Sequence, residues 1–516
     1  MKLLSGAVPA FTLSRNLGAQ SPLEIQRGPF EGTRESLQQY AVPDWFRDAK
    51  FGIWAHWGPQ SGVEQGDWYA RNMYIQGNRQ YEYHLAHYGH PSKVGYKDVC
   101  PLWTAAAFDP GYLMDLYKKA GARYFVSMGV HHDNFDLWDS KHTRWNAVKT
   151  GPQKDIVGMW RQAAIRRGLR FGVTEHLWIS YKWFAVSHGS DSTGPLAGVP
   201  YDGLNAAYAD LYHDAGCSRW SRANNPRQLG WDDDGVPDSW KQHWFLRIQD
   251  LVDQHQPDLL YTDGPLPFER YGYSAVANLY NQSAKRSGGK VEAVYTSKQP
   301  EDCAVGTCVL DFERGLANQI RAAAWQTDTC LGNWHYDVNV FRDHKYKTPK
   351  AVVDMLVDVV SQNGNLLLNF PLPNSGILDS DELQVLDGIT RWIQVNSEAI
   401  YGTRPWKIYG EGPGTRSEQP ASSMNERVRQ PLTAEEVRFT TKGHALYAVI
   451  MGWPGKEATV QALGTASLQR PGKIVNVELL GRQARLNWAQ EPAALRVQLP
   501  AEKPSDYAVT LKVTFA

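Results

Sequence analysis

Apolar and polar positions alternate in two different ways along this chain, and the pattern changes near residue 403. Between about residues 41 and 401, short apolar runs alternate with stretches of helical periodicity, which is typical of a mainly parallel α/β fold. The apolar runs predict strands at 51–57, 124–128, 169–174, 259–262, 291–296 and 365–370. The periodic stretches between them predict helices at 110–120, 155–167, 240–255, 349–361 and 381–396.

Beyond residue 403 the pattern consists of strands alone. Seven short runs, separated by turn residues, lie at 435–440, 445–452, 458–462, 473–480, 484–488, 495–499 and 507–515. Such spacing predicts a β-sandwich. We therefore expect an α/β chain in which a (β/α)₈-like, TIM-type catalytic barrel at 41–403 is followed by a β-sandwich domain at 404–516. The polar stretch 410–431 and the long aromatic segment 181–237 are expected to be loops, the second one over the barrel mouth.

The composition excludes some classes of binding partner. Lys plus Arg and Asp plus Glu both number 54, so no net field attracts nucleic acid or an anionic membrane. No stretch approaches the ~18 apolar residues of a membrane span. The 20 tryptophans and 25 tyrosines provide flat apolar walls as well as core packing. A neutral small molecule or a glycan is therefore the expected substrate, and the sequence leaves a homo-oligomer open.

The first 40 residues are predicted to be an N-terminal segment that includes a leader. Lys2 precedes a mildly apolar run at 3–13, and a small-residue stretch at 17–20 follows, although Pro9 interrupts the run. We expect a periplasmic or secreted protein, with the cytoplasm as the alternative.

The five cysteines show no paired C-x-x-C spacing, so they predict no zinc site. Cys303 and Cys308 lie close enough in the sequence to pair in an exported protein. Unpaired buried thiols are the alternative.

Polar side chains stand where several predicted strands end. Asp263 directly follows the strand at 259–262, and the carboxyl ends of barrel strands face the active site. Asp263 is therefore a candidate nucleophile or general base, and an aspartate that caps the next loop is the alternative. Three further strands carry or lead to histidines, namely His56, His131, His132 and His176.

Histidines beside tryptophans suit sugar recognition, because imidazole nitrogens bond to hydroxyl groups while indole stacks on the apolar face of the ring. A metal-dependent barrel hydrolase would also use His and Asp at strand ends. The first strand lacks the His-x-His pair of such enzymes, since His56 stands between Ala55 and Trp57. We expect neither a metal nor a cofactor.

Six motifs, in this order, resemble glycoside hydrolase family 29, the α-L-fucosidases. They are WFRDAKFGIWAHWG (45–58), GDWYARNMY (66–74), HHDNFDLW (131–138) with Ser140-Lys141 and Trp145-Asn146 after it, PDLLYTDG (257–264), WQTDTCLGNWHY (325–336) and GNLLLN (364–369). An ordered set of this length is too specific to arise by chance.

The resemblance implies a retaining exo-glycosidase with a barrel followed by a β-sandwich. It implies that Asp263 is the nucleophile that attacks the anomeric carbon of a terminal α-L-fucosyl unit and forms a covalent glycosyl-enzyme. It also implies contacts between the sugar and several side chains: His56, Asp67, Trp68, His131, His132, His176, Lys298, Trp325 and Trp334. Three of them depart from relatives: many have Glu in place of Asp67 and Arg in place of Lys298, and some have Tyr or Ser in place of His176.

A retaining mechanism needs a second carboxyl group, ~5–5.5 Å from the nucleophile and with a raised pKa. We choose Glu313, because it follows a short apolar run and is flanked by Arg314 and a loop-opening glycine. Glu301 is the second choice. An ion pair of Glu313 with Arg314 or Arg321 on a loop is the alternative.

The sequence thus predicts hydrolysis of terminal α-L-fucosides from glycoconjugates or oligosaccharides. A catalytically silent fucose-binding protein is the runner-up, and a metal-dependent barrel hydrolase is the third hypothesis. Linkage preference, the sugar beneath the fucose and the extent of transfucosylation stay open.

Overall fold

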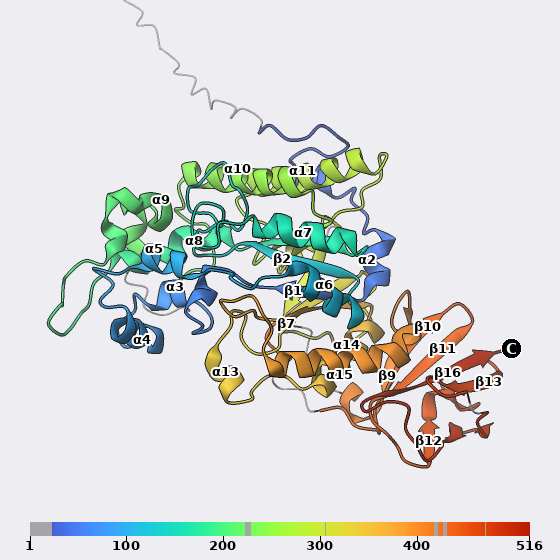
Figure 1. Cartoon of the computed structure of the whole chain (residues 1–516). Helices are drawn as coiled ribbons and strands as arrows, with labels where there is room; N and C mark the ends of the chain where they lie inside the picture. The colour runs from blue at the N-terminus through green and yellow to red at the C-terminus, as the bar shows by residue number, and fades with distance from the viewer. Residues whose placement is uncertain are drawn as a thin grey trace, which may run out of the picture.

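Eight parallel strands form a closed barrel at the centre of the molecule (Figure 1). The computed structural model describes residues 23–221, 229–304, 306–416, 422–426, 431–469, 471–483 and 485–516. The barrel strands are β1 (Phe51–Ala55), β2 (Tyr124–Val130), β3 (Arg170–Glu175), β4 (Leu259–Thr262), β5 (Val294–Ser297), β6 (Val309–Glu313), β7 (Trp325–Cys330) and β8 (Gly364–Asn369). Each strand pairs with the next, and β8 pairs with β1, which confirms the expected (β/α)₈-like barrel.

Helices cover the outside of the barrel. They include α6 (Pro110–Lys119), α7 (Ile156–Arg166), α10 (Asp238–His255), α11 (Arg270–Arg286), α14 (Pro349–Ser361) and α15 (Ser380–Asn396). Alternate side chains of β1 point to opposite faces of the barrel wall. Phe51 and Ile53 belong to the large core under the helices, whereas Trp54 belongs to a separate cluster with Tyr124 and Tyr261.

The hydrophobic pattern missed β6 and β7. Their sequences, VLDFE and WQTDTC, carry acids and hydroxyls, and yet every β7 residue is buried. Gln326 on β7 donates to Asp311 on the neighbouring β6 at 2.6 Å and accepts from Tyr124 on β2 at 2.9 Å, so buried polar groups bond to one another inside the barrel. A strand whose buried side chains are polar contains no apolar run, so the spacing of apolar residues along the sequence does not reveal it.

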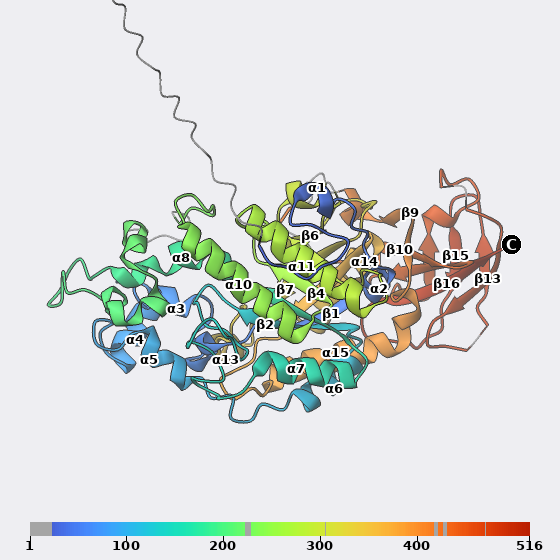
Figure 2. The ribbon, with the colours of Figure 1, turned by 90° about the horizontal axis from the view of Figure 1, so that it is seen from above.

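The loop expected at 181–237 is more ordered in its described part than predicted. It begins inside the short helix α8 (Ser180–Trp183), and it contains the helix α9 (Ala209–Tyr212) and several 3-10 turns. Buried aromatic rings such as Phe184 and Tyr212 pack inside it. Figures 1 and 2 show α3 (Tyr69–Asn72), α4 (Arg79–His87), α8 and α9 at one end of the barrel, opposite the C-terminal strands.

Two antiparallel sheets follow the barrel. The first has the order β13-β16-β11-β10-β9 and the second β12-β15-β14, and side chains from both form one apolar core. The strands are β9 (Arg404–Glu411), β10 (Val437–Lys442), β11 (Ala445–Ile450), β12 (Glu457–Val460), β13 (Ile474–Leu479), β14 (Trp488–Gln490), β15 (Leu495–Gln498) and β16 (Val509–Phe515). These paired sheets match the expected β-sandwich.

Two details of this region differ from the prediction. The pattern missed β9, whose last two residues belong to the stretch expected to be a loop, and it placed the strand β14 too early, at 484–488. Residues 417–421 and 427–430 of the expected loop lie outside the described residues. Among the helices of the described ranges, none is long and apolar enough to cross a bilayer.

Candidate active site

The carboxyl ends of the barrel strands surround a cavity of about 390 Å³. Nine of the side chains predicted from the sequence line it: His56, Trp68, His131, His132, His176, Asp263, Lys298, Glu313 and Trp334. The strand tips explain this convergence, because His56 follows β1, His131 follows β2, and His176 follows β3. Parallel strands in a closed barrel deliver all their carboxyl ends to one face.

Asp263 is fixed at its place by the backbone around it. Its amide donates to the carbonyl of Glu175 at 3.1 Å, and its own carbonyl accepts from the indole of Trp178 at 2.7 Å. Gly264 follows with a φ of 145°, and a Cβ there would lie 2.6 Å from the Trp178 ring. Only glycine fits this close turn, so the Asp-Gly step is what brings the carboxylate to the cavity.

Histidines and a lysine surround the Asp263 carboxylate. His176 donates to it from Nδ1 at 2.9 Å, and Nε2 of His132 lies 3.4 Å away. Lys298 donates to the other oxygen. Burial raises the pKa of Asp263, but the Lys298 charge and the hydrogen bonds to histidine outweigh burial and hold it well below its usual range.

Lys298 also donates to Glu313 at 2.6 Å. Two carboxylates that share one ammonium nitrogen have oxygens no more than two hydrogen-bond lengths apart, which is within the ~5–5.5 Å of a retaining glycosidase. Arg314 pairs with Glu426 instead of with its neighbour Glu313, and within the described residues Glu313 pairs with Lys298 and not with Arg321, so the alternative ion pairs from the sequence do not form.

Glu313 carries the opposite pKa shift to Asp263. Burial raises its pKa, Lys298 lowers it, and the negative charges of Asp263 and Asp328 raise it again, so the net shift is upward. The pKa values of these two neighbouring carboxyl groups are therefore shifted in opposite directions, downward for Asp263 and upward for Glu313. Such a split is the arrangement that acid and nucleophile require.

Hydrogen bonds fix the tautomers of the neutral histidines. The amide oxygen of Gln60 accepts from the backbone of Ala70, so its NH₂ group donates to Nδ1 of His131, and Nε2 of that ring carries the proton. His176 donates from Nδ1 and accepts at Nε2 from Thr174. Burial lowers the pKa of His131 well below the imidazole range and that of His176 to about 4, so both rings are uncharged.

Two further histidines have unused nitrogens. Within the described residues, no hydrogen-bond partner reaches either ring nitrogen of His56 or of His335, and all four atoms are buried. Burial lowers the pKa of His56 well below its usual value. The neutral ring of His56, with a free donor and a free acceptor, suits the hydroxyl groups of a sugar, whereas Nδ1 of His335 lies 3.5 Å from a carboxylate oxygen of Asp67.

Asp67 acts on the loop that carries Trp334. Its carboxylate accepts from the backbone of Trp334 at 3.1 Å and from that of His335 at 2.6 Å, and it does not line the cavity. Trp334 itself faces the cavity, with its ring centroid 5.8 Å from that of His56.

Two predicted residues lie elsewhere. Trp325 starts β7 at the opposite end of that strand, where it packs on Phe312 and donates to the carbonyl of Gln362. Glu301 is exposed on α12 (Pro300–Cys303) and does not line the cavity.

Sequence reasoning also missed residues that line the cavity, notably Trp54, Trp178, Trp231, Tyr261, Asp328 and Met424. Asp328 lies on the unrecognised strand β7, where the phenol of Tyr261 donates to it at 2.9 Å. Burial and the nearby Asp311 raise its pKa well above the usual range. The motif WQTDTC contained this acid, and its position in a buried polar strand was the missing signal.

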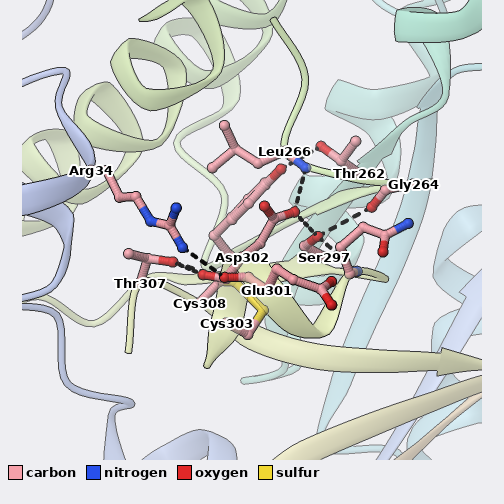
Figure 3. Close-up of a disulfide and its surroundings, with 12 residues drawn as sticks. Arg34, Thr262, Gly264, Leu266, Ser297, Glu301, Asp302, Cys303, Thr307 and Cys308 are labelled. Atoms are coloured by element: carbon pink, nitrogen blue, oxygen red, sulfur yellow. Dashed lines mark hydrogen bonds between the residues drawn. A yellow bond between two sulfur atoms is a disulfide. The ribbon is translucent and has the colours of Figure 1, made fainter. Parts of the chain in front are cut away.

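A disulfide joins Cys303 to Cys308 in the connection between β5 and β6 (Figure 3). The adjacent carboxylate of Asp302 accepts from the backbone of Leu266 at 2.6 Å and from Ser297 at 2.7 Å. Ser297 precedes Lys298, and Leu266 lies two residues after the Asp263-Gly264 turn. The disulfide-bonded connection is therefore hydrogen-bonded to both segments that carry these cavity residues. The sequence had left the pairing open.

Two overlapping histidine trios offer nitrogens within 4.8 Å of one another: His56, His131 and His335, and His131, His132 and His176. His176 already bonds through both nitrogens, which occupies the second trio. The first trio keeps free nitrogens, and the same atoms suit hydroxyl groups or a soft cation.

A TIM-type barrel whose cavity holds two close carboxyl groups, with pKa values shifted in opposite directions, among histidines and tryptophans is typical of glycoside hydrolases. Comparisons with known proteins refine this class. The family model for alpha-L-fucosidase matches residues 18–398, and the model for the alpha-L-fucosidase C-terminal domain matches residues 430–514. The chain belongs to the α-L-fucosidase family.

Individual relatives agree over nearly the whole chain. Tissue alpha-L-fucosidase of Rattus norvegicus is 26% identical, covering 93% of this chain and 91% of its own length, and the human plasma enzyme is 27% identical, covering 91% and 88%. The fold is similar to that of Thermotoga maritima alpha-fucosidase in complex with a mechanism based inhibitor, with a TM-score of 0.71 at 24% identity over 94% of this chain and 100% of that one.

Proposed function

We propose that the chain removes terminal α-L-fucosyl residues from glycans or oligosaccharides with net retention, with Asp263 as the nucleophile and Glu313 as the acid and base. The observation that carries this assignment is the Lys298 bridge between two carboxyl groups whose pKa values are shifted in opposite directions. Membership of the family indicates that the sugar is α-L-fucose, and the Lys298 bridge indicates the roles of Asp263 and Glu313.

In the first step an oxygen of Asp263 attacks the anomeric carbon, and the bond from that carbon to the glycosidic oxygen breaks. Glu313 gives its proton to the departing oxygen, so the leaving group departs as a neutral alcohol. Asp263 is suited to the attack because Lys298 and the histidines keep it ionised.

The second step reverses the role of Glu313. Once Asp263 is an ester it no longer carries a negative charge, so one cause of the raised Glu313 pKa disappears while Lys298 still lowers it. Glu313 then accepts a proton from a water molecule that attacks the anomeric carbon, and Asp263 leaves as a carboxylate. Two inversions give net retention.

The remaining groups of the cavity would hold the fucosyl ring. The free nitrogens of His56, together with His131 and His132, would bond to hydroxyl groups, and Trp68 and Trp334 would pack on apolar faces of the sugar. His335, which the sequence had not singled out, packs beside His56 but does not line the cavity, so it would act on the sugar only through His56. Trp325 is left out of this set because it is distant from the cavity.

Hydrolysis of an aryl α-L-fucoside tests the proposal. Asp263→Asn should lower kcat on the order of 10³-fold or more without changing the thermal midpoint of unfolding greatly, because the nucleophile is lost and the fold is not. Asp258→Asn is the matched control, since Asp258 precedes the same strand and pairs with Arg170 at its other end. No turnover of aryl fucosides or fucosylated oligosaccharides by the wild type would overturn the function.

The free nitrogens of His56, His131 and His335 favour a metal-dependent hydrolase as the second candidate. On the proposed mechanism no step needs a cation, so prolonged treatment with a chelator should leave kcat/KM unchanged. Elemental analysis of the treated protein checks that it holds no zinc, copper or nickel. Loss of activity that added metal restores would favour the second candidate.

We further propose export to the periplasm or the medium, because disulfides persist in oxidising compartments and one closes the β5–β6 connection. The expected leader falls within residues 1–22, which lie outside the described residues. A division of the chain into a catalytic domain at 41–403 and a β-sandwich domain at 404–516 is part of the same proposal, and a homo-oligomer stays an expectation.

A further inference from the structure

A segment from beyond the barrel forms part of the cavity wall. Residues 422–426 lie in the connection between β9 and β10, and they reach the end of β6. The amide of Met424 donates to the carbonyl of Glu313 at 2.7 Å, and the amide of Glu426 donates to that of Arg314 at 3.0 Å. The backbone that carries the proposed acid is therefore bonded directly to this segment.

Side chains of Asn425 and Glu426 fasten the C-terminal end of the same segment. Asn425 accepts from the amide of Leu316 at 2.9 Å and donates to its carbonyl at 3.1 Å. Glu426 accepts from Arg314 at 2.6 Å, from Thr329 at 2.7 Å and from Lys347 at 3.2 Å. Burial raises the pKa of Glu426, but these cations outweigh it and the net shift is downward, so the group is a carboxylate.

Met424 is held in an unfavourable backbone conformation. Its φ is 60°, in the left-handed region, which costs a non-glycine residue roughly 1 kcal/mol or more. Its side chain lines the cavity and is nevertheless 58% exposed. Surrounding bonds thus hold an apolar, polarisable side chain at the open rim of the cavity, next to Glu313.

The chemistry of the acid decides what lies there. Glu313 protonates the oxygen that leaves, so the group attached to that oxygen lies on the Glu313 side of the cavity. Trp231, which is 47% exposed, is the other large exposed apolar residue of the lining. It packs instead with Trp68 and with Trp178, which bonds to Asp263. Trp231 therefore belongs to the nucleophile side.

We propose that segment 422–426 forms the wall of the leaving-group subsite, with Met424 in contact with the pyranose ring that is released and Glu426 as the residue that positions it. This inference rests on the proposed roles of Asp263 and Glu313. It means that a side chain from outside the barrel selects which fucosylated sugar is cleaved. Thioether and methyl groups suit the apolar C–H face of such a ring.

Two substrates separate this role from general damage. α-L-Fucosyl fluoride carries no second sugar, and its fluoride leaves without a proton from the enzyme. The other substrate is the best one from a panel of α1,2-, α1,3-, α1,4- and α1,6-linked fucosyl disaccharides. Met424→Ala should lower kcat/KM roughly ten- to hundredfold for the disaccharide and less than about twofold for the fluoride.

Glu426→Gln should show the same selectivity with a smaller loss, because the amide keeps the shape and loses the charged bonds to Arg314 and Lys347. Trp231→Ala is the matched control within the cavity, and it should affect both substrates equally. Leu468→Ala, an exposed leucine far along the chain in the C-terminal region, should change neither. Thermal unfolding of each variant shows that it is folded.

The outcomes are distinguishable from failure of the proposed function. If the wild type cleaves neither substrate, the function itself fails. If it cleaves both, and Met424→Ala loses the two activities equally or loses neither, the subsite assignment is overturned. Equal disaccharide selectivity for Trp231→Ala would also overturn it, because the selectivity would then not belong to segment 422–426.

Discussion

The pKa values of Asp263 and Glu313, which share Lys298, are shifted in opposite directions. Asp263 receives hydrogen bonds from histidine in addition to the Lys298 charge, whereas Glu313 faces Asp263 and Asp328 and gains only the lysine. The difference lies in the neighbours and not in the residue type, because both groups are similarly half-buried and both touch the same ammonium nitrogen. Their roles follow from this asymmetry.

The pH profile of kcat/KM should be bell-shaped. Activity rises as Asp263 loses its proton, and it falls as the pH rises through the raised pKa of Glu313, because the acid is then lost. With an activated aryl fucoside, Glu313→Ala should keep the acidic limb and lose the basic limb. Initial rates across a pH series check this prediction.

A comparison of substrates with good and poor leaving groups provides the control for Glu313→Ala. The variant should slow substrates with poor leaving groups far more than activated aryl ones, which need little protonation, and azide should restore turnover of the latter. Equal losses on both classes, with the basic limb intact, would make Glu313 a positioning residue.

At the scale of elements, the sequence predicted six of the eight barrel strands, because their apolar runs are long enough to see. It missed β6 and β7 because acids, amides and hydroxyls replace apolar side chains at several buried positions of these two strands. In the segment 181–237 the prediction erred in the other direction, because it expected less regular structure than is present. The many turn residues of this segment predict a loop, whereas its described part contains short helices packed around aromatic rings.

The connection between β5 and β6 gives a prediction at this scale. The disulfide spans a sequence separation of 5, so removing it through Cys303→Ser with Cys308→Ser should lower the free energy of unfolding by about 2 kcal/mol. Denaturant titration measures the change. A reducing agent should shift the wild type by the same amount and leave the double variant unchanged, and a shift in the double variant would place the effect elsewhere.

At the scale of the whole molecule, barrel and C-terminal sheets meet through buried polar contacts. Arg438 on β10 donates to Asp358 on α14 at 2.5 Å and to Glu436 at 2.9 Å, with both members of the Arg438–Asp358 pair almost wholly buried. The indole of Trp392 on α15 donates to the carbonyl of Ala508 at 2.8 Å. Such contacts tie the two parts into one assembly.

Arg438→Met should therefore lower the free energy of unfolding by about 3–5 kcal/mol, because it leaves two carboxylates buried without their partner. Arg391→Met is the control: Arg391 pairs with Asp387 at the surface, with both side chains more than half exposed, and its loss should cost less than ~1 kcal/mol. Equal effects in denaturant titrations would show that burial of the Arg438 pair does not matter.

The sequence by itself determined the family, the barrel, the sandwich and the nucleophile candidate, because local periodicity and ordered motifs are properties of contiguous residues. Only the tertiary structure decided what surrounds each group. It brought Lys298 between Asp263 and Glu313, removed Trp325 and Glu301 from the cavity, and brought Met424 to it from beyond the barrel. The physical reason is that pKa, burial and contact depend on neighbours distant in sequence, and no local pattern encodes those distances.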